Sequence, residues 1–419
     1  MRISTSEYLS MNVQNMDNQQ SQLAQFYAEI SSGQAITTPA DNPLGAAQAV
    51  QLSMQGATLS QYASNQSAAL TSLGSEDTTL TSVTTALQSV KTQLLSAGDA
   101  TLNDTNRSAI AATLQNLSNT LMTLANTQSP SGGYLFGGFQ SASQPFTQNS
   151  AGTVVYNGDN GISSQQISDT TSVNTGDSGA AVFMSVSPET ASPVAYAASS
   201  NAGTGIIGAV STTNTLASAS GDTYGISFSV GGTPPATTYT VTDTNSAGVT
   251  TTSAAQPYTA GSAITLGSSG QSVTMTGTPS SGDSFTVQPA TQVPASQGGT
   301  NIFATIQNMI TALQTPADSS TAAAALTNTL NVGLTQVENT LSNVTTVQAT
   351  VGGREQQVQA MQTVSQSLSL QNTNSLADLT QIDLPSTISK YTQTQDSLQA
   401  SQEAFVQVAQ MSLFQYLNQ

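Results

Sequence analysis

The chain has 419 residues, and its 22 acidic and 5 basic residues give a net charge of -17 at neutral pH. This charge repels phosphate backbones and anionic headgroups, so we expect no nucleic acid and no membrane as a partner. The chain contains no Cys and no His, which excludes thiol nucleophiles, imidazole bases and the metal sites that such ligands build. We therefore expect no enzymatic activity, no catalytic or metal-binding residue and no cofactor.

The N-terminal segment predicts a helix with a coiled-coil seam. Its apolar residues recur mostly at spacings of three and four, as in a heptad repeat: Leu9, Val13, Met16, Leu23, Tyr27 and Ile30. Gly33 is expected to end this helix, because glycine readily adopts the left-handed conformation that follows a helix. Asn42 and Pro43 predict the N-cap and the first residue of a second helix.

The second predicted helix is much longer than a usual globular helix. Between about Pro43 and Ser96, leucines are separated by multiples of seven, at Leu52, Leu59, Leu73, Leu80, Leu87 and Leu94. At about 1.5 Å per residue, this helix would be on the order of 80 Å long. Such a length indicates a rod-like bundle or coiled coil, and a third helix, from Ile110 to Leu124, is expected to run back along it.

The C-terminal flank repeats this pattern. Apolar residues from Leu334 to Val358 keep the spacing of three and four, which predicts a further long helix. Gly352 and Gly353 interrupt it only weakly, and we expect them to allow close contact with a neighbouring helix. A final helix is predicted beyond Asp383.

The region between the flanks has a different composition. From Gly132 to Gly299 it is rich in Gly, Ser, Thr and Pro, with short alternating runs that are typical of strands and turns. Its acidic residues lack the spacing of a calcium loop. Those that adjoin glycine, Asp159, Asp222 and Asp283, are interpreted as turn residues that accept local backbone hydrogen bonds.

Together these patterns predict an α+β multidomain protein. A long coiled-coil-like helical bundle would be formed by the N- and C-terminal segments, with a central all-β insertion of two small units. The predicted domains are a terminal helical assembly domain (1–43 and 384–419), a helical rod domain (44–131 and 300–383), a first β domain (132–220) and a second β domain (221–299). The second β domain is expected to be a self-contained insertion.

The two extreme ends carry short apolar stripes that little of the remaining chain can cover. We therefore expect these stripes to pack between subunits of an assembly. The candidate assembly-interface residues are Ile3, Tyr8, Leu9, Val13, Leu398, Phe405, Leu413, Phe414, Tyr416 and Leu417.

Several motifs resemble one family, the hook-filament junction proteins known as flagellar hook-associated protein 3, within the bacterial flagellin superfamily. The N-terminal matches are the start Met1-Arg2-Ile3-Ser4-Thr5 and the stretch from Thr38 to Pro43. The C-terminal matches are Val351-Gly352-Gly353-Arg354, Ser397 to Gln402 and Ser412 to Leu417. Tyr134 to Phe139 is similar to the family's entry into its β domain.

The resemblance implies an extracellular structural adaptor of the bacterial flagellum, located at the hook-filament junction. Such a protein is exported by the flagellar type III apparatus with an export chaperone. It assembles with copies of itself as a ring between the first hook-associated protein and flagellin.

Two other functions remain open from the sequence. The first is a filament-forming flagellin, which shares the helical plan and would polymerise into long filaments. The second is a surface adhesin, whose β unit would bind a host ligand through an exposed aromatic or acidic patch.

Overall fold

A computed structural model describes residues 5–130, 132–150, 152–213, 221–268 and 270–417. The chain divides into two compact units. The terminal unit comprises residues 1–64 and 361–419, and the central unit comprises residues 65–360. Two long helices, α2 (Pro43–Ala97) and α7 (Ser320–Thr380), run from one unit into the other.

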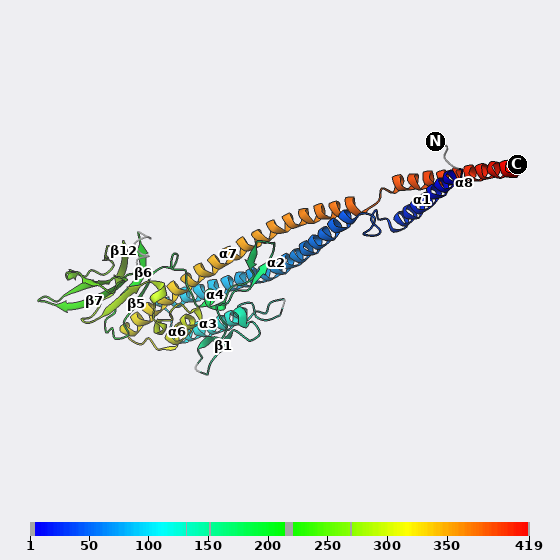
Figure 1. Cartoon of the computed structure of the whole chain (residues 1–419). Coiled ribbons are helices and arrows are strands. Elements are labelled where there is room, and N and C mark those ends of the chain that lie inside the picture. Colours follow the sequence, from blue (N-terminus) through cyan, green and yellow to red (C-terminus); the bar gives the residue numbers. More distant parts are fainter. Residues whose placement is uncertain (1–4, 131, 151, 214–220, 269, 418–419) are drawn as a thin grey trace. The chain divides into compact units, whose positions relative to one another are not determined.

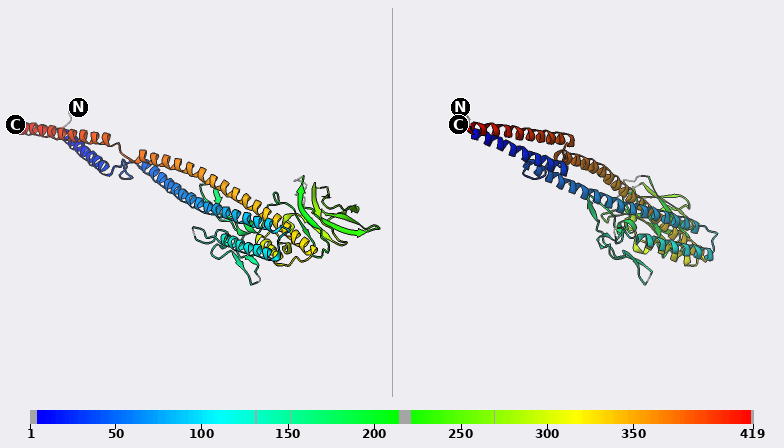
Figure 2. Two further views of the ribbon diagram at one scale, coloured as in Figure 1. Left: turned by 180° about the vertical axis from the view of Figure 1, so that it is seen from behind. Right: turned by 90° about the vertical axis from the view of Figure 1, so that its right-hand side faces the viewer.

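The terminal unit contains two helices that join the ends of the chain. Helix α1 (Thr5–Ser32) packs along α8 (Leu384–Leu417), and Figure 2 shows them side by side in both views. The predicted end of α1 is confirmed, since Gly33 follows it with a φ of 71°. The predicted N-cap of α2 is also confirmed, because the Gly45 amide donates to Asn42 Oδ1 at 2.9 Å.

The helices of the central unit enclose the core that the heptad leucines predict. Figure 1 shows α3 (Asp104–Ala125) and α6 (Ile302–Gln314) beside α2 and α7, and α3 packs against α6. The side chains of Leu73, Leu80 and Leu87 on α2 are fully buried, as are Val337, Val344, Val351 and Val358 on α7. The leucine and valine repeats therefore form a core within this unit.

A first β region lies beside these helices. Its elements are η1 (Gly138–Gln140), β1 (Phe146–Gln148), β2 (Val154–Tyr156), β3 (Ser164–Gln166), β4 (Ser172–Asn174) and α4 (Gly179–Phe183). The pairs β1-β2 and β3-β4 are both antiparallel. The ring of Phe146 lies 5.4 Å from that of Phe183 and 5.5 Å from that of Phe303, so aromatic packing attaches this region to α6.

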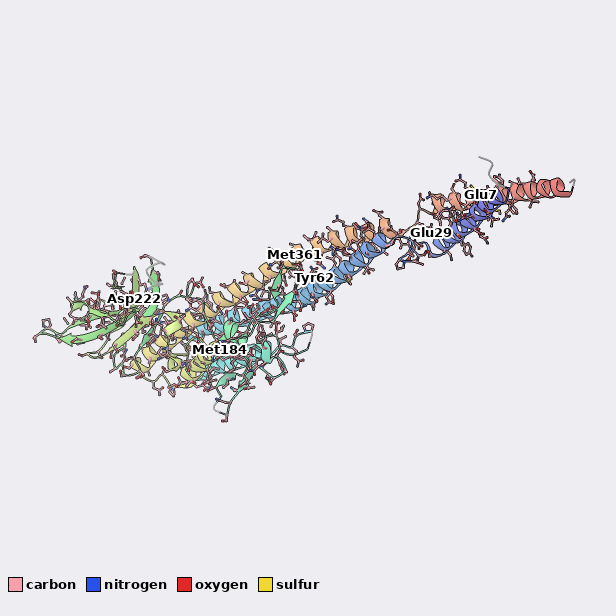
Figure 3. The ribbon with its side chains drawn as sticks, in the orientation of Figure 1. Glu7, Glu29, Tyr62, Met184, Asp222 and Met361 are labelled. Carbon is pink, nitrogen blue, oxygen red and sulfur yellow. The ribbon has the colours of Figure 1, made fainter. Side chains whose placement is uncertain are left out.

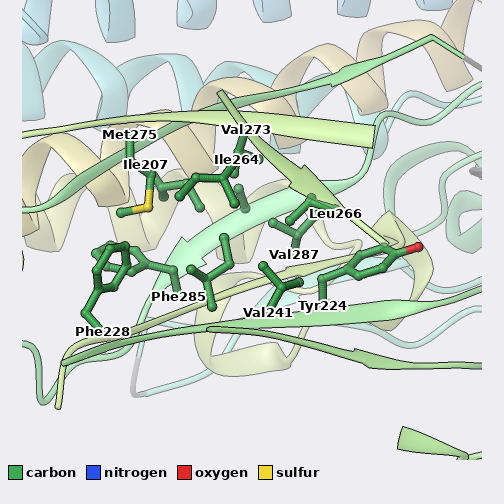
Figure 4. Close-up of a cluster of buried hydrophobic side chains, with 12 residues drawn as sticks. Ile207, Tyr224, Phe228, Val241, Ile264, Leu266, Val273, Met275, Phe285 and Val287 are labelled. Atoms are coloured by element: carbon green, nitrogen blue, oxygen red, sulfur yellow. The ribbon is translucent and has the colours of Figure 1, made fainter. Parts of the chain in front are cut away.

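The second β region is a sandwich of two sheets. Its strands are β5 (Val194–Ala197), β6 (Ile206–Thr212), β7 (Thr223–Gly231), β8 (Ala236–Thr244), β9 (Thr250–Thr252), β10 (Gln256–Pro257), β11 (Ala263–Leu266), β12 (Gln271–Thr276) and β13 (Ser284–Gln288). The six-stranded sheet has the order β10-β8-β7-β13-β5, with β9 also paired to β8, and the three-stranded sheet has the order β11-β12-β6. Figure 4 shows the side chains between them. Two short helical turns, η2 (Ala290–Gln292) and η3 (Ala295–Gln297), then lead to α6.

The strand pairing corrects the expected division at residue 221. Strand β5 pairs with β13, and β6 pairs with β12, so residues 194–212 belong to the same sandwich as residues 223–288. Each strand needs a partner for its backbone amides and carbonyls, and the alternating runs do not reveal which distant strand supplies it. The expectation that the segment from Gly221 to Pro289 is self-contained is therefore wrong.

The glycine pair in α7 also differs from the expectation. A Cβ atom added at Gly352 or Gly353 would meet nothing within 4 Å. The spacing of small residues cannot indicate which face of a long helix is covered. These two glycines therefore do not provide a close helix contact within the described part of the chain.

Candidate assembly surface

The terminal unit has an unusual distribution of apolar side chains. Among its described side chains, no hydrophobic one is buried, since the buried hydrophobic core extends from Ala69 to Val358. Its large exposed apolar residues are Tyr8, Met11, Val13, Tyr27, Leu44, Val50, Met54, Val364, Leu368, Leu370, Leu384, Ile388 and Val406. We call this set the terminal apolar surface. Exposed apolar side chains that gather in one unit are typical of a region that packs against other proteins.

The structure brings the predicted interface residues onto two paired helices. Tyr8 and Val13 lie on α1 with 47% and 41% of their surface exposed, and Leu398 and Phe405 on α8 are half-buried. Ile3 lies outside the described residues. For Leu9, Leu413, Phe414, Tyr416 and Leu417, only the helical backbone is described, so their side chains lie outside what the structure describes.

Several exposed apolar residues were missed by the interpretation of the sequence. Val50 and Met54 are four residues apart at the start of α2, and Leu384 and Ile388 are four apart at the start of α8. This spacing places each pair on one helix face, which is the signal that could have identified them. The predicted heptad seam is itself only partly covered, because Tyr27 is 65% exposed.

Polar contacts hold the helices of the terminal unit together. On α1, Gln19 Nε2 donates to Ser397 Oγ of α8 at 3.0 Å. Between α2 and α7, Asn372 Nδ2 donates to the Leu52 carbonyl at 3.1 Å. These polar contacts do not cover the terminal apolar surface, and no described hydrophobic side chain of this unit is buried.

The segment that connects α1 to α2 is hydrogen-bonded to the segment that connects α7 to α8. The Ala35 amide donates to the Thr380 carbonyl at 2.7 Å, and Gln34 and Gln381 form an antiparallel bridge. In the same connection, the Thr38 amide donates to Asp41 Oδ2 at 2.7 Å. This backbone hydrogen bond, together with one from the Thr37 hydroxyl, lowers the pKa of Asp41.

A buried charged cluster connects α2, α7 and the first β region in the central unit. Arg354 Nη1 and Nη2 donate to the two carboxylate oxygens of Asp177 at 2.8 and 3.2 Å. The Asp177 amide donates to Glu76 Oε1 at 3.0 Å. Burial, and then the charge of Asp177, raises the pKa of Glu76 to about 8. Glu76 is therefore mostly protonated at neutral pH.

Helix α7 holds both β regions through a series of amide side chains. Asn343 Nδ2 donates to the Ala181 carbonyl at 2.8 Å, and Asn339 Nδ2 donates to the Ser192 carbonyl at 2.9 Å. Farther toward the start of the helix, Asn328 Nδ2 donates to the Gly205 carbonyl at 2.9 Å. Because these hydrogen bonds are buried or partly buried, they fix how the β regions sit on α7.

The turn roles expected for two acidic residues are confirmed. Asp159 Oδ1 accepts hydrogen bonds from the Phe139 and Gly161 amides, both at 2.8 Å. Asp283 accepts from the Ala202 and Ser280 amides, also at 2.8 Å. Within the described ranges, no group of three or more acidic side chains is placed to hold a metal ion.

Within the described ranges, none of the helices is both long enough and apolar enough to span a bilayer.

Comparisons with known proteins agree with the motifs at both ends. The model of the bacterial flagellin N-terminal helical region matches residues 3–141. Flagellar hook-associated protein 3 of Escherichia coli strain K12 is 27% identical over 420 residues, covering 99% of each chain. The protein of the same name from Salmonella typhimurium strain LT2 is also 27% identical with the same coverage.

Solved structures give the same result for the fold. The hook-associated protein 3 structure from Legionella pneumophila has a TM-score of 0.68 at 27% identity, covering 78% of this chain and 98% of that one. A FlgL structure from Xanthomonas campestris has a TM-score of 0.64 at 23% identity, covering 77% and 98%. The α+β fold class and the resemblance to flagellar hook-associated protein 3 are thus confirmed.

Proposed function

We propose that this chain is a structural adaptor of the bacterial flagellum that joins the hook to the flagellin filament. The relatives that match nearly its full length are flagellar hook-associated proteins. This similarity supports a role as a flagellar junction protein. One structural observation carries the mechanism. The terminal unit pairs the two ends of the chain while leaving many of its large apolar side chains exposed, as expected of a subunit that completes its core by assembly.

The partners follow from this role. The chain associates with flagellar components, as expected for a hook-associated protein. We propose that these are the first hook-associated protein, flagellin and further copies of the chain in a ring, with an export chaperone before assembly. The proposed location is outside the cell, at the hook-filament junction, after export through the flagellar type III apparatus.

A filament-forming flagellin is not favoured. The flagellin model matches only residues 3–141, whereas the hook-associated relatives match 99% of the chain. We propose no enzymatic activity, because the full-length relatives are structural flagellar proteins.

The assembly role is tested by placing a charge on the terminal apolar surface. Val406 on α8 is 52% exposed, so Val406→Glu should leave folding intact while burying a charge in any subunit contact. Val155, which is also exposed but lies in the central unit, provides the matched control Val155→Glu. In a strain that lacks the gene, we expect the Val155 variant to restore motility and the Val406 variant to fail.

Thermal melting separates the possible outcomes. If Val406→Glu melts like the wild type and cannot restore motility, the surface acts in assembly. Normal motility with this variant would contradict the proposed role of this face. A fluorescent label on the working protein should give one spot at the base of each filament, and a uniformly labelled filament would instead support a flagellin.

A further inference from the structure

The β-sandwich of the central unit contains a groove that the assembly role does not use. The six-stranded sheet is wider than the three-stranded sheet, whose outer strand on this side is β11. The inner face of β8, β9 and β10 therefore extends past β11 without being covered by another strand. The result is a groove of about 650 Å³ between these strands and β11. This volume lies within the range of about 300 to 1,000 Å³ that is common for ligand sites.

The side chains in the groove are polar where a sandwich normally has apolar ones. Tyr239, Val241 and Asp243 alternate along β8, so they share its inner face. Val241 belongs to the core in Figure 4, and Tyr239 packs against this core, whereas Asp243 on the same face is polar. Thr251 pairs directly with Asp243, and Gln256 pairs with Tyr239, so both add polar groups to the same face.

Asp243 is the distinctive residue of this groove. Its Oδ1 atom is inaccessible to solvent and has no hydrogen-bond donor among the residues that the structure describes. Gly267, at a φ of 56°, leaves room for this side chain, since a Cβ atom there would lie 2.8 Å from Asp243 Oδ2. Burial raises the pKa of Asp243, and the charge of Asp222, which Figure 3 labels, raises it further. Neither carboxylate oxygen accepts a hydrogen bond from the described residues, and because Oδ1 is buried, Oδ2 is the atom that a ligand in the groove would reach.

We propose that this groove binds a neutral carbohydrate, whose hydroxyl groups donate to Asp243. The hydroxyl and amide side chains of Thr251 and Gln256 match the alternating donors and acceptors of a sugar. Tyr239 supplies an aromatic side chain at the same site. The binding site is separate from the terminal apolar surface and does not depend on the adaptor role.

The charges around the groove select against other ligands. The chain has no basic residue between Arg107 and Arg354, so an anionic sugar or a phosphate would find no positive partner in the sandwich. An extended peptide could pair with the free edge of β11, but the groove offers hydroxyl groups rather than apolar pockets for peptide side chains. These features favour a neutral polyol.

The proposal is tested with the full chain and an array of neutral oligosaccharides of glucose, galactose, mannose and N-acetylhexosamines. Saturation-transfer NMR should identify at least one neutral ligand, and its sialylated counterpart should bind more weakly. Asp243→Ala should weaken binding by at least about tenfold, because it removes a charged hydrogen-bond acceptor. Thr251→Trp should have a similar effect, because exposed Thr251 lies directly opposite Asp243 on the same face and lines the groove, so the larger ring would fill it.

The control is Asp222→Asn, which removes a neighbouring charge without changing the lining of the groove. Its affinity should stay within about twofold of the wild type, because charges with solvent access contribute little. The proposal is overturned if no neutral oligosaccharide in the array binds, or if Asp243→Ala and Thr251→Trp bind as the wild type does. Binding of a short alternating Thr-Val peptide with no sugar bound would assign the groove to a peptide instead.

Discussion

The terminal and central units have similar heptad patterns, but they differ in how deeply the apolar residues of the pattern are buried. In the central unit, Leu73, Leu80 and Leu87 have no exposed surface. In the terminal unit, the described residues of the same kind of seam are at most half-buried, and Val13 and Tyr27 are exposed. A seam thus becomes a core only where additional elements cover it, and α3, α6 and the β regions provide that cover in the central unit alone.

This difference has a simple geometric origin. Two packed helices share one narrow contact line, so apolar residues beside that line stay in contact with water. A third and a fourth helix surround the line from the other sides. The terminal unit therefore retains exposed apolar surface, whereas the central unit buries its seam by its own packing.

The largest effect is expected from two deletions that test whether the sandwich is a separate part of the central unit. Deleting residues 221–289 would leave β5 and β6 without β13 and β12 and would expose Ile207. We expect this variant to aggregate, because unpaired strand edges and exposed apolar side chains associate.

Replacing residues 194–288 with a short Gly-Ser linker removes the whole sandwich instead. Val194 pairs with Gln288, so the two cut ends lie on neighbouring strands and can be joined. The helices of this variant should stay folded by circular dichroism, with a lower melting temperature because Val194 no longer packs near Val332 and Asn328 loses its hydrogen-bond partners. If the shorter deletion is equally soluble, the corrected boundary is wrong.

The second prediction compares truncation of a seam residue in each unit. Leu80→Ala creates a cavity in the central core and should lower the free energy of unfolding by about 2 to 5 kcal/mol. Val13→Ala, at an exposed position, should change it by less than about 0.5 kcal/mol. Urea unfolding measures both values. Equal losses would mean that the terminal seam is as well packed as the central one.

The third prediction concerns the ion pair between Arg354 and Asp177. Both side chains are largely buried, so Arg354→Ala leaves an uncompensated carboxylate and should cost about 3 to 5 kcal/mol. The pair between Lys91 and Glu338 joins more exposed side chains, so Lys91→Ala should cost less than about 1 kcal/mol. Chemical denaturation of both variants measures the free energy of unfolding that each one loses. Equal losses would contradict the prediction, because they would mean that the Arg354 pair contributes no more than a surface pair.

The fourth prediction concerns a pH dependence that arises from Glu76. Its pKa is raised from 4.5 to about 8 in the folded protein, so the folded state retains a proton that the unfolded state has lost between these values. The stabilising contribution is complete below pH 4.5 and is lost as the pH rises through about 8. The slope from this group is at most about 1.4 kcal/mol per pH unit.

Glu76→Gln removes this titration while keeping a side chain of similar shape. The difference in unfolding free energy between the variant and the wild type should therefore change with pH in favour of the variant between pH 5 and pH 8. Denaturant unfolding at three pH values within this window measures the trend. A difference that does not vary with pH would show that Glu76 titrates normally in the folded protein.

Much of the helical architecture can be predicted from local features of the chain. The leucine spacing predicts α2, Asn42 and Pro43 predict its start, and Gly33 predicts the end of α1. These features are local because capping and heptad periodicity involve residues within a few turns of one another. The likeness of the ends to a flagellar family is likewise carried by short motifs.

The sequence by itself therefore determined the helices, their seams and the presence of a β-rich middle. Only the tertiary structure decided which strands pair across residue 221, that Gly352 and Gly353 meet no neighbour, and that the inner face near Asp243 is uncovered. The physical reason is the same in each case. Periodicity shows which side of an element is apolar, but burial depends on what other elements cover that side, and those elements come from distant parts of the chain.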